Sequence, residues 1–381
     1  MEHHYVQWRE DGCVRSARWG AAHRHLVAAD IVVAGDELRA EQAMSLARRN
    51  RAVLWRGDYR NARQLLAAVK RRLDRRPVPH DGTPADAFHQ YRRATADRAH
   101  IVSRVLIELG PGYHLDLPHA PDVSQACLQA YGPATERLVT PLSELLGVLG
   151  AHQWRRRGVR VPVLGERIHP HYGVFAPTRQ EYLDLVAAAP WPRATTAFDV
   201  GTGTGVLAVL LAQRGAGQVV ATDIQARAVA CAQDNVDRLR LADNIRIEQA
   251  DLFPPGRADL VVCNPPWLPA VPTSELDAAI YDPGGRMLRR FLYGLSDHLA
   301  PGGEAWLVLS DLAERLGLRT RQELTEMLAT AGLCVADRLD TRPRHRTRHQ
   351  SDPLAEYRTA EIISLWRLTS PVRGHCPRYR P

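Results

Sequence analysis

The sequence predicts an α/β fold in which a helical N-terminal domain precedes a seven-stranded, Rossmann-like sheet. Three observations predict this fold. From residue 197 onward, short β-rich runs alternate with helical segments, as in a parallel sheet covered by helices. A glycine-rich turn follows the first of these runs, and an Asn-Pro-Pro-Trp segment follows the fourth. The expected strands are residues 197–200, 218–222, 245–249, 258–263, 304–310, 333–338 and 361–368.

The first part of the chain is expected to be helical, because apolar residues recur at helical spacing between clusters of Gly and Pro. Residues 1–158 form this predicted N-terminal domain, which would serve as a substrate-recognition domain or a lid. Residues 159–381 form the predicted catalytic domain. The expected N-terminal helices are residues 40–54, 61–73, 85–109 and 134–149.

The composition leaves the partner open. The 381 residues carry a formal net charge of +8, and Lys70 is the only lysine. This balance fits a nucleic acid or an acidic partner, or a coding bias that replaces lysine by arginine. No run of 18 apolar residues and no paired Cys/His spacing occurs, so neither a membrane span nor a metal site is expected. The polar N-terminus lacks an apolar leader segment, so we expect a cytoplasmic protein.

The glycine turn runs from Asp199 to Gly205, with glycines at 201, 203 and 205. Glycine allows a tight turn and lets a ligand approach the backbone without contacting a Cβ atom. The helix that follows presents free N–H groups at its N-terminus. Val206 stands where a dinucleotide-binding fingerprint requires its third glycine, so the turn predicts a ligand site of another kind.

Two carboxylates follow the next two strands. Asp223 ends the second strand, where a carboxylate can accept hydrogen bonds from both hydroxyls of a ribose. The alternative is that Asp223 caps the helix that begins after it. Asp251 follows the third strand, and its alternative interpretation is a solvated loop carboxylate.

The segment Asn264-Pro265-Pro266-Trp267 directly follows the fourth strand. The two prolines end the strand and stiffen the loop at the edge where such sheets bind ligands. A planar amide or aromatic amine is a poor nucleophile because its lone pair is delocalised. The side-chain oxygen of Asn264 and the carbonyl of Pro265 can each accept one of its N–H groups, which aims the lone pair, while Trp267 offers a ring for stacking. The alternative is a proline-rich connection with a buried tryptophan.

Taken together, these motifs resemble those of class I methyltransferases that act on amino or amide nitrogens, and most of all the HemK family of protein-(glutamine-N5) methyltransferases. The resemblance covers about residues 170–310 and includes a Gly-rich stretch followed by a helix at residues 281–288. It implies S-adenosyl-L-methionine as the cofactor. The residues that it implies for cofactor binding are Asp199, Gly201, Thr202, Gly203, Gly205, Asp223, Ile224, Asp251, Leu252 and Asn264.

Some features depart from the HemK pattern. Trp267 stands where the family usually has tyrosine, and residues 176–181 match the family's I-P-R-P-E-T segment only in part. Residues 172–175, Tyr-Gly-Val-Phe, also resemble ribosomal-RNA guanine-N2 methyltransferases.

The resemblance implies a glutamine side chain in a protein as the methyl acceptor, with a translation factor such as a release factor as partner. Three alternatives remain. In the first, the acceptor is a base amine, adenine N6 or guanine N2, in RNA or DNA, and the basic loop Arg342 to Gln350 binds phosphates. In the second, the acceptor is a small metabolite or peptide of a biosynthetic pathway. In the third, the chain binds the cofactor but does not catalyse a reaction; the intact Asn264-Pro265-Pro266 segment argues against this alternative.

Overall fold

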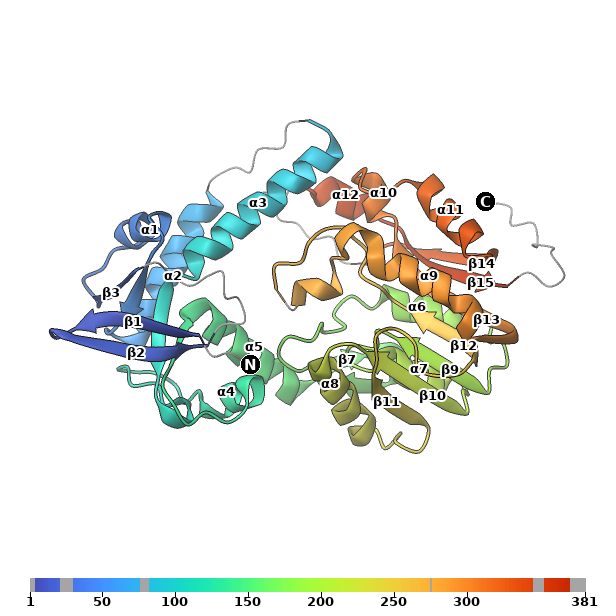
Figure 1. Cartoon of the computed structure of the whole chain (residues 1–381), viewed down its shortest axis with the longest axis horizontal. Helices are drawn as coiled ribbons and strands as arrows, with labels where there is room; N and C mark the ends of the chain where they lie inside the picture. Colours follow the sequence, from blue (N-terminus) through green and yellow to red (C-terminus); the bar gives the residue numbers. More distant parts are fainter. Residues whose placement is uncertain (1–3, 21–29, 76–81, 275, 345–352, 371–381) are drawn as a thin grey trace. The chain divides into compact units, whose positions relative to one another are not determined.

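A computed structural model describes residues 4–20, 30–75, 82–274, 276–344 and 353–370 of the chain (Figure 1). The chain forms two compact units. Unit 1 comprises Met1–Asp81 and Asp86–Gln153, and unit 2 comprises Gly82–Ala85 and Trp154–Pro381. The division lies within helix α5 (Leu142–Arg157), so the predicted boundary between residues 158 and 159 follows the last residue of that helix.

Unit 1 is built around a mixed six-stranded sheet, so the prediction of a helical N-terminal domain is wrong. The strand order is β1-β2-β6-β5-β4-β3. The strands are β1 (Tyr5–Glu10), β2 (Cys13–Trp19), β3 (Asp30–Ala34), β4 (Arg51–Trp55), β5 (Val105–Leu109) and β6 (Leu138–Pro141). The helices, besides α5, are α1 (Ala40–Arg48), α2 (Tyr59–Asp74), α3 (Pro84–Val102) and α4 (Ser124–Tyr131).

Three strands of unit 1 were expected to be parts of helices, and the cause is the same for all three. Strands β4, β5 and β6 are short, almost continuously buried runs that adjoin a helix in the sequence. Periodicity alone cannot distinguish a fully buried strand from another turn of helix. Between α1 and β4, Asn50 takes a left-handed conformation with φ of 57°, which ends the helix and reverses the chain.

Unit 2 contains the sheet that carries the sequence motifs. Its strand order is β11-β10-β9-β12-β13-β15-β14, with β15 antiparallel to both of its neighbours and the other pairs parallel. The predicted alternation of strands and helices in this part of the chain is confirmed. The strands are β9 (Thr196–Val200), β10 (Gln218–Asp223), β11 (Ile245–Gln249), β12 (Ala258–Cys263), β13 (Leu299–Ser310), β14 (Cys334–Thr341) and β15 (Ile363–Thr369).

Helices cover both faces of this sheet, and residues that alternate along a strand contribute to different clusters of buried side chains. On β9, Ala197 packs with helices α6 (Glu181–Ala188), α7 (Val206–Gln213) and α8 (Ala226–Arg238). Its neighbour Phe198 packs with α9 (Arg286–His298) and α11 (Arg321–Thr330) on the other face. Both faces of the sheet are therefore buried, as is usual for parallel strands.

The remaining elements of unit 2 are short. They are a hairpin of β7 (Val159–Val161) and β8 (Glu166–Ile168), helices α10 (Leu312–Arg315) and α12 (Ala355–Ala360), and 3-10 turns at Pro162–Leu164, Leu276–Ala279 and Pro283–Gly285. Unit 1 has a 3-10 turn at Pro111–Tyr113. Within the described ranges, no helix combines the length and apolar character needed to cross a membrane. Of the basic loop Arg342 to Gln350, residues 345–350 lie outside the described residues.

The first turn of α9 is held by a buried carboxylate. Asp282 is 5% exposed, and its two oxygens accept hydrogen bonds from the backbone N–H groups of Met287 (3.0 Å) and Leu288 (3.1 Å). These donors have no partner within the helix, so the carboxylate both satisfies them and complements the positive end of the helix dipole.

We therefore expect Asp282→Ala to destabilise unit 2 by about 1–2 kcal/mol, the usual effect of losing a capping side chain. This corresponds to a drop of roughly 2–8 °C in the thermal midpoint, measured by calorimetry on the full chain. The control is Asp297→Ala, an exposed residue of the same helix. Equal midpoints for the two variants would contradict the capping role.

Candidate functional site

The site lies at the carboxyl edge of three neighbouring strands. In the β9–β12 pair Val200 is opposite Cys263, and in the β9–β10 pair it is opposite Thr222. Gly201 follows β9, Asn264 follows β12 and Asp223 is the last residue of β10, so all three lie at the same edge of the sheet. β9 and β12 flank the point where the order of strands reverses direction, and ligands bind at such points in open α/β sheets.

The glycine turn has the backbone geometry for which glycine is needed. Gly201, Gly203 and Gly205 have φ values of 76°, 56° and 80°. The N–H of Gly201 and that of Thr202 both donate to the carbonyl of Thr222, at 2.9 and 2.8 Å. A Cβ atom at Gly205 would lie 3.3 Å from the backbone Cα of Ala232 in α8, so this glycine also allows close packing.

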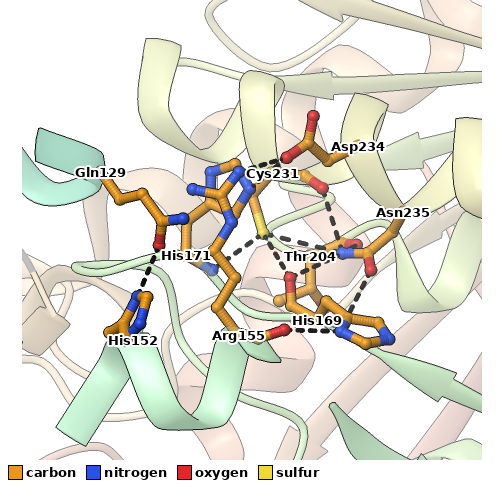
Figure 2. Close-up of polar contacts among 9 residues, drawn as sticks. All are labelled: Gln129, His152, Arg155, His169, His171, Thr204, Cys231, Asp234 and Asn235. Carbon is orange, nitrogen blue, oxygen red and sulfur yellow. Dashed lines mark hydrogen bonds and ion pairs between the residues drawn. The ribbon is translucent and has the colours of Figure 1, made fainter. Parts of the chain in front are cut away.

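A buried asparagine that sequence reasoning missed is hydrogen-bonded to this turn (Figure 2). Asn235 of α8 is 1% exposed, and its amide nitrogen donates to the carbonyls of Thr204 (3.1 Å) and His169 (3.2 Å). Its oxygen accepts the N–H of His169 at 2.7 Å. One side chain thus links the glycine turn to the segment that follows β8. No signal in a single sequence marks Asn235 for this role.

A second group of contacts holds the same segment against α8 (Figure 2). The carboxylate of Asp234 accepts hydrogen bonds from Arg155 at 2.5 Å and from the ring of His171 at 2.8 Å. Burial, together with the charge of Arg155, lowers the pKa of His171 below its ordinary value. These contacts place residues 169–171 beside the glycine turn.

Asp199 lies beneath the turn and is fully buried. Its Oδ2 accepts hydrogen bonds from the hydroxyl of Thr202 (2.6 Å) and the N–H of Ala208 (3.0 Å). Its Oδ1 is buried and has no hydrogen-bond partner among the described residues. Burial raises the pKa of this carboxyl to about 7, against the opposite effect of the two hydrogen bonds. A cation bound at the turn would favour the ionised form, so Asp199 fits a positively charged ligand.

Asp223 joins the turn to the start of α8. Its Oδ2 accepts the N–H of Gly203 at 3.1 Å, and its Oδ1 accepts the N–H of Gln225 at 2.9 Å. Burial raises its pKa above the ordinary value, and the backbone donors oppose that shift. Each carboxylate oxygen still has a second lone pair, so the side chain keeps the capacity to accept two hydroxyl groups. The neighbouring Ile224 is 60% exposed and offers an apolar surface at the same edge.

The two residues expected after the third strand differ in their surroundings. Asp251 is exposed, and both of its oxygens are engaged by Arg290 of α9 at 3.0 and 2.9 Å. Leu252 has a φ of 78°, which is a costly conformation for a residue with a Cβ atom, and its carbonyl accepts the hydroxyl of Thr222. The strained backbone of Leu252 is thereby tied to the end of β10. The sequence showed no sign of the Asp251–Arg290 pair.

The Asn-Pro-Pro-Trp loop has an internal hydrogen bond that we did not expect. The indole N–H of Trp267 donates to Oδ1 of Asn264 at 2.9 Å. Asn264 and Trp267 are half-buried and Pro265 is buried. One lone pair of Oδ1 is used by the indole and one remains for a ligand. Trp267 also packs against both clusters of buried side chains that flank the sheet.

Sequence reasoning also missed Arg179, which precedes α6. Its guanidinium lies over the Trp267 ring, 5.7 Å from the centroid, and it forms a 2.8 Å ion pair with the buried Glu361. The only available signal was that Arg179 falls in the partly matching segment 176–181. In the part of the chain that the structure describes, no group of three or more His, Cys, Asp or Glu side chains could hold a metal ion.

The known proteins that this chain resembles in sequence include methyltransferases. Residues 167–331 match the family model described as methyltransferase small domain. The release factor glutamine methyltransferase of Cereibacter sphaeroides is 34% identical over 180 residues, which are 44% of this chain and 63% of that protein. The tRNA1(Val) (adenine(37)-N6)-methyltransferase of Shewanella loihica is 32% identical over 136 residues, 33% of this chain and 56% of that protein. The chain thus spans less than two thirds of either relative's length.

Among solved structures, a methyltransferase from Pyrococcus furiosus is 17% identical and has a TM-score of 0.41. The match covers 58% of this chain and 98% of that one.

The geometry of Asp223 leads to a binding test. Replacing Asp223 by Ala removes an acceptor whose charge-assisted hydrogen bonds are worth about 1.5–3 kcal/mol each. We expect the dissociation constant of S-adenosylmethionine to rise at least about tenfold, measured by calorimetry. Asp243→Ala, an exposed carboxylate beyond α8, is the control of equal charge. An unchanged constant in Asp223→Ala would refute the assignment to the ribose.

The raised pKa of Asp199 leads to a pH test. With a pKa of about 7 this carboxyl is mostly protonated at lower pH, and we expect a bound cation to favour release of that proton. The affinity for S-adenosylmethionine should therefore rise between pH 5.5 and 7, by at most about tenfold per pH unit, and level off above. Asp199→Asn should flatten the profile. Parallel profiles for the two proteins would contradict this role of Asp199.

The raised pKa of Asp199 also affects the stability of the protein without ligand, which should fall as pH rises. An unfolded Asp199 loses its proton near its ordinary pKa of 3.8, whereas the folded protein keeps it up to about 7. The contribution of this group to stability is therefore present at low pH and is lost as pH rises between these values.

Proposed function

We propose that this chain is a class I S-adenosylmethionine-dependent methyltransferase, and that it transfers the methyl group to the side-chain amide nitrogen of a glutamine in a protein acceptor. A translation release factor is the acceptor that the proposal favours, because the relative from Cereibacter sphaeroides carries that name. Translation factors act in the cytoplasm, so the proposal also places this chain there.

One observation carries the proposal, namely the register of β9 and β12. Because Val200 is paired with Cys263, the glycine turn and the Asn-Pro-Pro-Trp loop begin side by side. A cofactor over the turn and an acceptor at Asn264 would then face each other at one edge of the sheet. Alignment of two bound reactants can supply ~7–11 kcal/mol of barrier reduction in favourable cases.

The residues around the turn fit the cofactor. When bound, S-adenosylmethionine supplies an electrophilic methyl group. The proposal assigns Asp223 to the ribose hydroxyls, Ile224 and the backbone of Leu252 to the adenine ring, and Asp199 to the cationic end of the molecule. Asp251 is assigned to the adenine amino group, which would share the carboxylate with Arg290 or replace it. The turn residues Gly201, Thr202, Gly203 and Gly205 would allow close approach of the ligand.

Asn264 and Pro265 would act on the acceptor. The free lone pair of Asn264 Oδ1 and the carbonyl of Pro265 would each accept an N–H of the amide, which turns the nitrogen lone pair toward the methyl group. No strong base would be needed beforehand, since the amide proton becomes acidic as the nitrogen–carbon bond forms and the sulfur–carbon bond breaks, and this proton would then pass to water. Pro266 and Trp267 would keep this loop rigid and line the acceptor site. These fixed dipoles need little reorganisation during the reaction.

Two further assignments belong to the proposal. The family model leaves unit 1 unmatched, and we assign unit 1 to acceptor recognition. A base amine in RNA is the second candidate for the acceptor, because the relative from Shewanella loihica is an adenine-N6 methyltransferase. The chain's surplus of arginine would then contact phosphates.

The role of Asn264 is tested by Asn264→Ala. We expect turnover to fall by at least about a hundredfold, in line with the loss of one fixed hydrogen-bonding group at a reacting atom. The cofactor dissociation constant should stay within about twofold, since Asn264 is assigned chiefly to the acceptor. If affinity for the cofactor and turnover fell together, the assignment to the acceptor would be wrong.

The acceptor class is tested with methyl-labelled cofactor in a lysate that contains the purified chain. We expect the label in the protein fraction, on a glutamine residue identified by mass spectrometry. Asn264→Ala is the matched control for background incorporation. Label in RNA, with binding that weakens steeply as salt rises, would replace the glutamine proposal by the base-amine alternative.

A further inference from the structure

Trp267 is held on both its ring face and its N–H group. The guanidinium of Arg179 lies 5.7 Å from the ring centroid, within the range of a cation–π contact. The N–H of the same ring donates to Oδ1 of Asn264 at 2.9 Å. A tyrosine at this position would have its polar atom at the end of the ring and could not reproduce this arrangement. The indole thus connects a charged residue before α6 with the amide proposed to bind the acceptor.

Arg179 is itself anchored by a buried acid. Its Nη2 lies 2.8 Å from Oε2 of Glu361, whose side chain is 1% exposed, while that of Arg179 is 41% exposed. The other oxygen of Glu361 accepts the hydroxyl of Ser310 at 2.5 Å. A buried carboxylate requires partners of this kind, so the guanidinium has little freedom to leave. Ser310 ends β13, which neighbours β12, so the anchor belongs to the same edge of the sheet.

The consequence for Asn264 is geometric. An asparagine amide can rotate and can present either its oxygen or its nitrogen at a given point. A donor fixed at one lone pair of Oδ1 requires the oxygen to be on that side. The second lone pair of the same oxygen is then also fixed in direction. An acceptor amide needs an oxygen at this point, because it offers N–H groups.

We propose that Arg179 is a positioning residue for methyl transfer, which acts through Trp267 to orient the amide of Asn264. The inference rests on the proposed function, because it presumes that Asn264 binds the acceptor. It also accounts for the tryptophan in Asn-Pro-Pro-Trp, since the indole offers both a broad face to the cation and an N–H group to the amide. In this role Arg179 would act through Trp267 and would not itself contact the reacting atoms.

The experiment compares Arg179→Met, Arg179→Lys, Trp267→Phe and the double variant Arg179→Met/Trp267→Phe in the full chain. For Arg179→Met we expect kcat to fall about tenfold, with the acceptor KM and the cofactor dissociation constant within twofold of the wild type. Arg179→Lys keeps the charge and should recover most of the rate. Because both residues act on one amide, the double variant should be no slower than Trp267→Phe. Arg240→Met, an exposed arginine beyond α8, is the matched control.

A second readout does not depend on activity. The chain has eight tryptophans, and Trp267→Phe identifies the indole N–H signal of Trp267 in a nitrogen–proton NMR spectrum. In Arg179→Met this signal should shift and its proton should exchange faster with water, whereas the other indole signals stay in place. The variant leaves the buried Glu361 without its cation, so Arg179→Met/Glu361→Gln repeats the measurement without that charge.

The outcomes separate the hypotheses. An unchanged kcat together with an unchanged Trp267 signal overturns the positioning role. A raised acceptor KM at constant kcat also overturns it, since Arg179 would then contact the acceptor directly. If the wild type fails to methylate a release factor, the proposed acceptor falls, and kcat is measured with the fraction that takes up label. The Trp267 signal then still decides whether Arg179 controls the loop.

Discussion

The pairing of β9 with β12 is the constraint on which the site depends. The carboxyl ends of parallel strands in register lie at one edge, so the pairing of Val200 with Cys263 brings the glycine turn beside the proline loop. The two loops have different properties because they do different work. In the proposed function, the turn would let a ligand approach the backbone, which favours glycine, whereas the loop would hold two oxygen acceptors in fixed positions, which favours proline.

Two acidic side chains near this edge, Asp199 and Glu361, are buried, and burial disfavours their charged forms. Asp199 is buried, one of its oxygens has no hydrogen-bond partner among the described residues, and burial raises its pKa to about 7. In the proposed function, the cationic end of the cofactor would stabilise the ionised carboxylate. Glu361 is just as buried, yet the protein itself provides its partners, Arg179 and Ser310. The first acid is thus suited to binding a ligand and the second to holding a side chain in place.

The two units differ in how well local patterns describe them. In unit 2, Gly, Pro and Asp residues separate most strands from helices, so most elements could be predicted close to their observed bounds. An exception is β13, which directly follows α9 and begins at Leu299 instead of residue 304. In unit 1, strands β4, β5 and β6 adjoin helices with little punctuation, and their apolar residues read as further helical turns. One signal was overlooked there. Asp11-Gly12, with φ values of 51° and 75°, connects β1 and β2, and such a pair between alternating apolar residues is a strong hairpin signal.

The sequence by itself determined the class of the sheet, the glycine turn, Asp223 and the Asn-Pro-Pro-Trp loop, because each depends on residues adjacent in the chain. The tertiary structure alone decided which side chains meet. Arg179 and Glu361 are 182 positions apart, and Asp251 and Arg290 are 39 apart. Only packing of the helices on the sheet brings such pairs together. The orientation of Asn264 belongs to the same class, since it depends on an indole whose own position is set by two hydrophobic clusters and a distant arginine.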